Sequence, residues 1–98
     1  MSIEALRSLL IQRLPELQRR YHVRSLGLFG SRVRGDARPD SDLDVLVEYD
    51  EAPTLFQVVR LEDELTELAG AKVDLVLRDS LRPELAPRIL REVVPCHA

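Results

Sequence analysis

The stretch LGLFGSRVRGDARPDSDLDVLVEYD, residues 26–50, decides the fold of this chain. Apolar runs at 23–29 and 43–49 predict two strands, and a Gly-Ser turn follows the first of them. Between the strands, residues 31–35 predict a single helical turn, and GDARPDS at 35–41 predicts a loop. Because this connection is short, the two strands can pair antiparallel, and a purely parallel sheet is not required.

Helical spacing of apolar residues precedes this stretch and follows it. A helix or helix pair is predicted over residues 2–21, with a kink or a restart near Leu14 because Pro15 follows. After the second strand, Thr54 and Gln57 form a capping-box pattern that predicts the start of another helix. Gly70 is typical of the residue that ends such a helix.

The remaining residues complete the predicted fold. KVDLVL at 72–77 predicts a third strand, and 88–94 a last short helix. Residues 78–86 predict an irregular segment, because Pro83 and Pro87 argue against one continuous helix there. The prediction is an α+β fold (mixed α/β), in which a mixed sheet of three or slightly more strands is flanked by helices in the order α-β-α-β-α-β-α. The 98 residues predict one domain spanning 1–98.

Composition excludes several classes of protein. The net charge of −3, with acidic and basic residues interspersed, makes nucleic acid an unlikely partner by general charge attraction. No apolar run approaches the ~20 residues of a membrane span. Cys96 is the only cysteine, which suits a reducing, cytoplasmic location, and we predict a surface thiol in a frayed tail.

Three carboxylates carry the chemistry of the sequence. Asp42 and Asp44 stand at alternate positions, so their side chains share one face of a strand and repel each other unless a cation lies between them. Magnesium suits two carboxylates with phosphate oxygens and water. Asp74, in the apolar strand KVDLV, is costly unless it is paired or coordinated. The alternative is a pair of exposed aspartates at a strand start.

A phosphate site is predicted beside these carboxylates. Gly30 and Ser31 offer backbone N–H groups and a hydroxyl just past a strand end, where phosphates bind readily. Arg32, Arg34 and Arg38 lie between the two halves of the motif and can meet a triphosphate. A phosphate cradle next to paired carboxylates is what magnesium-dependent nucleotidyl transfer requires.

The motif resembles that of a known superfamily. Gly30-Ser31, ten residues, and then Asp42-x-Asp44 is similar to the signature of the DNA polymerase beta-like nucleotidyltransferases. More narrowly, the stretch resembles the minimal nucleotidyltransferases (the MNT proteins), whose third carboxylate Asp74 matches. The resemblance covers almost the whole chain, since these proteins consist of little beyond the catalytic core.

The resemblance implies roles for the motif residues. Gly30 and Ser31 bind the triphosphate of ATP, and Arg34 matches an arginine that contacts phosphate. Asp42 and Asp44 bind two magnesium ions, one of which Asp74 shares. The implied reaction transfers a nucleoside monophosphate, AMP from ATP, to a hydroxyl and releases pyrophosphate.

The resemblance also implies a partner. Many minimal members pair with a HEPN-type toxin, a ribonuclease that the nucleotidyltransferase silences by adenylylating a tyrosine. A homodimer or hetero-oligomer can complete the site, since no second domain is predicted. Near the C-terminus, apolar residues form a contact surface or simply cover the sheet (Leu81, Leu85, Ile89, Leu90, Val93 and Val94).

Two other functions stay open. In one, the chain is a binding antitoxin that neutralises its partner by covering the partner's active site. In the other, it transfers a nucleotide to RNA or to a small molecule, although the sequence shows no basic stripe and no second domain for such acceptors.

Overall fold

The computed structural model describes residues 2–97, which form four helices, four strands and one short 3₁₀ turn. In chain order these are α1 (Ile3–Tyr21), β1 (Val23–Phe29), α2 (Ser31–Arg34), β2 (Leu43–Tyr49), α3 (Leu55–Ala69), β3 (Val73–Leu77), the 3₁₀ turn η1 (Arg78–Ser80), α4 (Ala86–Glu92) and β4 (Val94–Pro95). The predicted order of elements is confirmed, and β4 is an addition to it. Within the described residues, no helix has the length and apolarity to cross a membrane.

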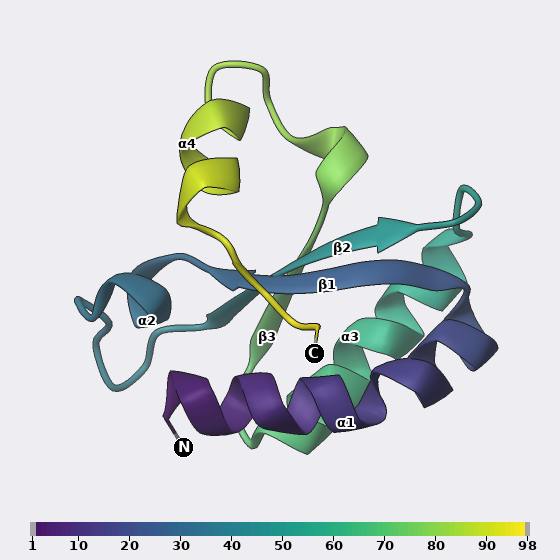
Figure 1. Cartoon of the computed structure of the whole chain (residues 1–98), viewed down its shortest axis with the longest axis horizontal. Coiled ribbons are helices and arrows are strands. Elements are labelled where there is room, and N and C mark those ends of the chain that lie inside the picture. Colours follow the sequence, from purple (N-terminus) through teal and green to yellow (C-terminus); the bar gives the residue numbers. More distant parts are fainter. Residues whose placement is uncertain (1, 98) are drawn as a thin grey trace.

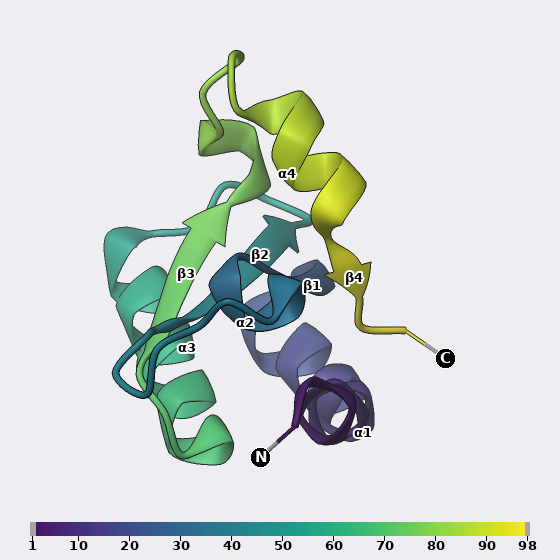
Figure 2. The ribbon, with the colours of Figure 1, turned by 90° about the vertical axis from the view of Figure 1, so that its left-hand side faces the viewer.

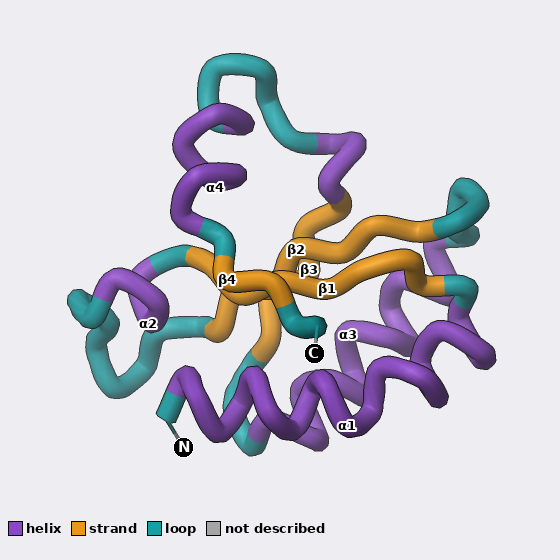
Figure 3. Tube along the Cα trace, viewed as in Figure 1, coloured by secondary structure: helices purple, strands orange, loops and turns teal. Residues whose placement is uncertain are grey.

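The strands form one sheet in the order β3-β2-β1-β4. β1 pairs antiparallel with β2 and with β4, whereas β2 and β3 run parallel, so the predicted mixed sheet is confirmed. α3 supplies the crossover that a parallel pair needs. Figures 1 and 2 show α1 and α3 on one face of the sheet and α4 on the other. Figure 3 shows the sheet between these two helical layers.

The core lies between the sheet and the helices α1 and α3. Leu28 of β1, Val45 of β2 and Leu61 of α3 are 0% exposed. Burial of each such side chain contributes about 2 kcal/mol relative to exposure in water. Side chains alternate along β2, so Val45 faces the core while Asp44 and Leu46 point to the opposite face. We call that opposite side the α4 face.

Both long helices begin as the sequence predicts. Ser2 caps α1 by accepting a hydrogen bond from the Ala5 N–H at 3.1 Å, and Thr54 and Gln57 form a complete capping box at the start of α3. Gly70 ends α3 in the left-handed conformation, as expected. Of the two predicted alternatives near Leu14, a kink or a restart, the restart is wrong, because α1 continues through Pro15 as one helix.

The C-terminal segment differs most from prediction. The last helix runs from Ala86 to Glu92, not over 88–94, and the chain becomes extended at Val93. Pro95 favours the extended segment that follows, because a proline disfavours helical geometry in the residue before it, here Val94. The extended residues then pair with β1, Val94 opposite Leu28 and Pro95 opposite Gly27. A proline is tolerated here because β4 is an edge strand.

The prediction of a surface thiol at Cys96 is wrong. The pairing of β4 carries Cys96 onto the core, where it is 1% exposed and its N–H donates to the Leu26 carbonyl at 2.9 Å. Burial raises the pKa of the Cys96 thiol to about 11. The thiol is therefore protonated and shielded as long as β4 stays in place.

Arg7 of α1 fastens this C-terminal segment. Its Nε donates to the Pro95 carbonyl at 2.8 Å and its second nitrogen donates to the His97 carbonyl at 3.0 Å. Replacing Arg7 with alanine removes both hydrogen bonds, so local opening of β4 becomes more frequent. We expect the rate at which an aromatic disulfide reagent labels Cys96 to rise about tenfold.

Arg13→Ala is the matched control, since Arg13 is exposed on the same helix and contacts neither carbonyl. Its labelling rate should equal that of the unmodified chain. Equal rates in the Arg7 and Arg13 variants would show that β4 holds without the arginine.

Candidate active site

The three predicted carboxylates lie at one end of the α4 face. In the sheet register, Asp44 of β2 stands beside Asp74 of β3 on one side and Phe29 of β1 on the other. Neighbouring strands are about 4.8 Å apart, so the Asp44 and Asp74 side chains leave the same face close together. Asp42 precedes β2 by one residue and lies two residues from Asp44. Asp74 is exposed on this face rather than buried in an apolar strand.

The electrostatics of Asp44 reflect this crowding. Burial, followed by the charges of Asp74 and Asp42, raises the pKa of the Asp44 carboxyl, and nearby Arg34 opposes the rise only in part. Within residues 2–97, no hydrogen bond or ion pair compensates the Asp42, Asp44 and Asp74 carboxylates. An added cation would relieve the repulsion between them.

The donor set fits magnesium. Among the described residues, no three His, Cys, Asp or Glu side chains are gathered closely enough to enclose a metal ion by themselves. Magnesium does not need such an enclosure, because it is usually held by one or two carboxylates together with substrate phosphates and water. The unpaired oxygens of the three aspartates therefore suit an ion that arrives with a phosphate ligand.

The Gly30-Ser31 turn lies against Asp44. Gly30 has φ 85° and ψ −160°, a conformation that is essentially restricted to glycine. Its carbonyl accepts from the N–H groups of Val33 and Arg34, both at 3.1 Å, which starts α2. A Cβ atom on Gly30 would lie 1.9 Å from Oδ2 of Asp44. The turn thus needs glycine both for its backbone angles and for the close approach of the carboxylate.

A hollow of about 250 Å³ opens at this turn. We call it the Asp44 hollow. Gly30, Arg34 and Asp44 line one side of it, together with Phe29. The other side comes from α4 and the residue before it: Leu85, Arg88, Ile89 and Glu92. Sequence analysis missed Arg88 and Glu92, although their spacing with Leu85 and Ile89 is that of one helix face.

Arg34 lies in the Asp44 hollow but is already paired. Its guanidinium donates to Glu92 Oε1 at 2.7 Å and to Asp36 Oδ2 at 3.3 Å. The two other candidate arginines are not brought to the carboxylates. Arg32 lines a different hollow near the start of α1, and Arg38 is exposed in the loop before β2. Of the three, only Arg34 is in place to meet a phosphate bound at Gly30.

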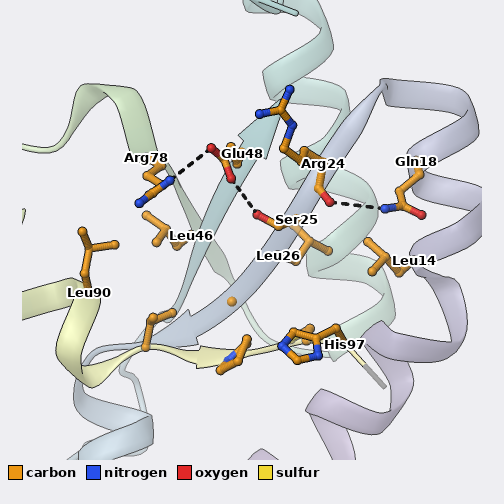
Figure 4. Close-up of a pocket in the computed structure, with 14 residues that line it drawn as sticks. Leu14, Gln18, Arg24, Ser25, Leu26, Leu46, Glu48, Arg78, Leu90 and His97 are labelled. Atoms are coloured by element: carbon orange, nitrogen blue, oxygen red, sulfur yellow. Dashed lines mark hydrogen bonds and ion pairs between the residues drawn. The ribbon is translucent and has the colours of Figure 1, made fainter. Parts of the chain in front are cut away.

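A larger pocket of about 350 Å³ is lined from both faces of the sheet, by Leu14 and Gln18 of α1 and by Leu90 of α4. Figure 4 shows Leu46 and Leu90 beside it, with Arg78 and Ser25 both directed to the Glu48 carboxylate. These hydrogen bonds measure 3.1 Å from Arg78 and 3.3 Å from Ser25. The lining is mainly apolar with a few polar groups at the rim, which is typical of a pocket for a small organic group.

Some of the C-terminal apolar residues cover the sheet, and others are exposed and can form a contact surface. Val93 covers the sheet, since a Cβ atom on Gly27 would lie 2.5 Å from its Cγ2. Leu85 and Leu90 remain 43% and 38% exposed and are available for contact.

Comparison with known proteins assigns the family. The sequence profile of the nucleotidyltransferase domain matches residues 10–96, which include the Gly-Ser turn, the three aspartates and most of α1. The chain belongs to the nucleotidyltransferase domain family. Together with the relatives described next, this match confirms the resemblance to the minimal nucleotidyltransferases.

Similarity to individual proteins supports the assignment of this nucleotidyltransferase to the family. It is 45% identical over 94 residues to the protein adenylyltransferase MntA of Thermococcus cleftensis, an alignment that covers 96% of this chain and 95% of that protein. A solved structure described as a minimal nucleotidyltransferase superposes with a TM-score of 0.79 and 40% identity, covering 97% of this chain and 96% of the other.

A more distant structure shares the fold. The complex of a tri-AMPylated HEPN toxin with an MNT antitoxin, from Shewanella oneidensis, contains a chain that superposes with a TM-score of 0.65. Its identity to this nucleotidyltransferase is 20%, and the match covers 92% of this chain and 71% of that one. At this identity the likeness concerns the fold alone.

Proposed function

We propose that this nucleotidyltransferase transfers AMP from ATP to a tyrosine hydroxyl of a HEPN-type toxin and so acts as its antitoxin. The observation that carries the proposal is the register of Asp44 beside Asp74, at the edge of a turn that only glycine can form. Similarity over nearly the full length to a protein adenylyltransferase supports a protein acceptor. The reaction takes place in the cytoplasm, where a free thiol such as that of Cys96 stays reduced.

In this proposal, some residues of the site bind the nucleotide and others bind the metal. Gly30 and Ser31 hold the triphosphate with backbone N–H groups and a hydroxyl. Asp42, Asp44 and Asp74 would hold magnesium, the first two as ligands of two ions and Asp74 as a ligand of one of them. When bound, magnesium neutralises phosphate charge and favours attack at phosphorus.

The chemical step exchanges one bond for another at the α-phosphorus. The tyrosine oxygen forms a bond to the α-phosphorus, the bond from that phosphorus to the bridging oxygen of pyrophosphate breaks, and the hydroxyl proton passes to solvent water. Attack in line with the leaving group places the acceptor opposite the pyrophosphate. Asp74, which is exposed on β3 at the outer edge of the sheet, lies where an incoming protein can reach the site.

The first experiment uses ATP labelled at the α-phosphate. The purified chain, magnesium and labelled ATP are added to lysate from the source cells, and the labelled product is analysed by gel and by mass spectrometry. We expect label on a tyrosine of a single protein. Asp63→Asn, on the exposed side of α3, should label that protein equally well.

The remaining outcomes separate the alternative functions. Label in the RNA fraction would contradict a protein acceptor. A partner that is bound and neutralised equally well by the Asp42→Asn variant, without label, would identify an antitoxin acting by occlusion. In such a complex the partner would bind to the exposed apolar side chains of Leu55, Phe56 and Val59 on α3.

A further inference from the structure

The wall that α4 contributes to the Asp44 hollow contains a second arginine. Leu85, Arg88, Ile89 and Glu92 are spaced as i, i+3, i+4 and i+7, so they lie along one side of the helix. This side faces Gly30, Arg34 and Asp44 across the hollow. The hollow is therefore bounded by an arginine on each side, Arg34 from α2 and Arg88 from α4.

The two arginines differ in how far their charge is already neutralised. Arg34 is paired with two carboxylates, those of Glu92 and Asp36. The Arg88 side chain makes no ion pair or hydrogen bond among the described residues. Glu92, four residues after Arg88, is the natural partner for it within the helix. Because Glu92 pairs with Arg34 instead, the Arg88 guanidinium is left exposed at the hollow.

A guanidinium in this position suits a polyanion. The proposed site already places a nucleoside triphosphate at Gly30 and Asp44, and the charge on Arg34 is largely compensated. We infer that Arg88 binds the β- and γ-phosphates of the nucleotide from the α4 side of the Asp44 hollow. Arginine is suited to this role because its planar fork donates two parallel hydrogen bonds to phosphate oxygens. The inference rests on the proposed nucleotide site and adds a residue outside its sequence motif.

If Arg88 binds the phosphates, α4 and Glu92 both help to position the arginines of the hollow. Glu92 orients Arg34 beside the Gly30-Ser31 turn. Because its carboxylate is paired with Arg34, it does not neutralise Arg88. α4 carries Arg88 across the hollow because β4 fastens the end of this segment to β1. Nucleotide affinity should thus depend on a helix that the Gly-Ser and Asp-x-Asp motif does not include.

Calorimetric titration of the full chain tests the inference without any acceptor. The ligand is an ATP analogue with a methylene group between the α- and β-phosphorus atoms, which cannot be cleaved, in the presence of magnesium. We expect Arg88→Gln to weaken binding of the analogue about 10- to 100-fold, the range for loss of a charge-assisted hydrogen bond. Binding of AMP, which lacks the β- and γ-phosphates, should not change. The affinity of Arg88→Lys for the analogue should lie between those of the unmodified chain and of Arg88→Gln, because lysine keeps the charge but lacks the planar guanidinium.

Arg91→Gln is the matched control, since Arg91 lies on the same helix and does not line the hollow. It should bind the analogue like the unmodified chain. Equal affinities in the Arg88 and Arg91 variants would overturn the inference, as would an equal loss of AMP and analogue binding in Arg88→Gln. Melting temperatures of all variants establish that they are folded.

The same titration separates this inference from the proposed function. If the unmodified chain does not bind the analogue, the proposed function fails and the inference fails with it. If the unmodified chain binds and Arg88→Gln binds equally well, the inference alone fails.

Discussion

Replacing Asp44 with asparagine is expected to lower AMP transfer at least about 1,000-fold while the chain stays folded. Asparagine has the shape of aspartate but lacks the charge, and it would leave the metal without one of its two central ligands. The charge stabilisation that a metal supplies is worth several kcal/mol, and each ~1.4 kcal/mol is a factor of ten in rate. The measurement is the initial rate of label transfer, with Asp63→Asn as control. Full activity in the Asp44 variant would contradict the proposed site.

The same substitution should make the unliganded chain more stable. Burial and the neighbouring carboxylates raise the pKa of Asp44 in the folded state. Where the folded chain holds a proton that the unfolded chain has lost, stability falls as the pH rises. The loss of stability is complete above the raised pKa of Asp44, and Asp44→Asn removes it.

Thermal unfolding at two pH values checks the stability effect. Without magnesium, the melting temperature of Asp44→Asn should exceed that of the unmodified chain at pH 7, and the difference should shrink as the pH falls below the pKa of Asp44. Magnesium with nucleotide should raise the melting temperature of the unmodified chain only. A variant that melts lower at pH 7 would show that the Asp44 charge is compensated in the folded chain.

Replacing Gly30 with alanine is expected to destabilise the chain by about 3 kcal/mol and to abolish nucleotide binding. The backbone angles of Gly30 alone cost a residue with a Cβ about 1–3 kcal/mol. The new Cβ would also lie 1.9 Å from Oδ2 of Asp44, so the carboxylate or the turn must move. For a domain of this size, the melting temperature should fall by roughly 15 °C.

Two further variants separate backbone strain from the clash. Gly35→Ala places alanine at φ 85° and ψ 12°, in the ordinary left-handed region, and meets no atom within 4 Å, so it should cost only about 1 kcal/mol and gives the cost of a positive φ without a clash. Truncating the clashing side chain, in the double variant Gly30→Ala with Asp44→Ala, should recover part of the stability lost in Gly30→Ala. If the double variant is less stable than Gly30→Ala, the carboxylate is not the obstacle.

The elements that could be predicted from sequence are those defined by local patterns. The alternation of Asp42 and Asp44 with apolar residues placed both carboxylates on one face, and the Thr54–Gln57 capping box marked the start of α3. The Gly30-Ser31 turn followed from a strand that ends in glycine. In each case, residues close in the sequence determine the geometry.

The rest depends on contacts between distant residues. β4 has only two residues, one of them a proline, so the sequence contains no alternating pattern that would predict this strand. Its pairing with β1 buries Cys96 and fixes where α4 ends, and these contacts bring Arg88 and Glu92 to the Asp44 hollow. That Asp74 stands opposite Asp44, rather than one step away, likewise depends on the register of two strands separated by α3.

The route of the chain through the sheet sets the order in which the site is completed during synthesis. β1, the Gly30-Ser31 turn and β2 come from neighbouring residues, so the turn and Asp44 are made early in synthesis. β3 adds Asp74 only after the whole of α3 has been made, and α4 adds Arg88 later still. Because a domain folds as a unit, a nascent chain gains nucleotide transfer only after α4 has been made.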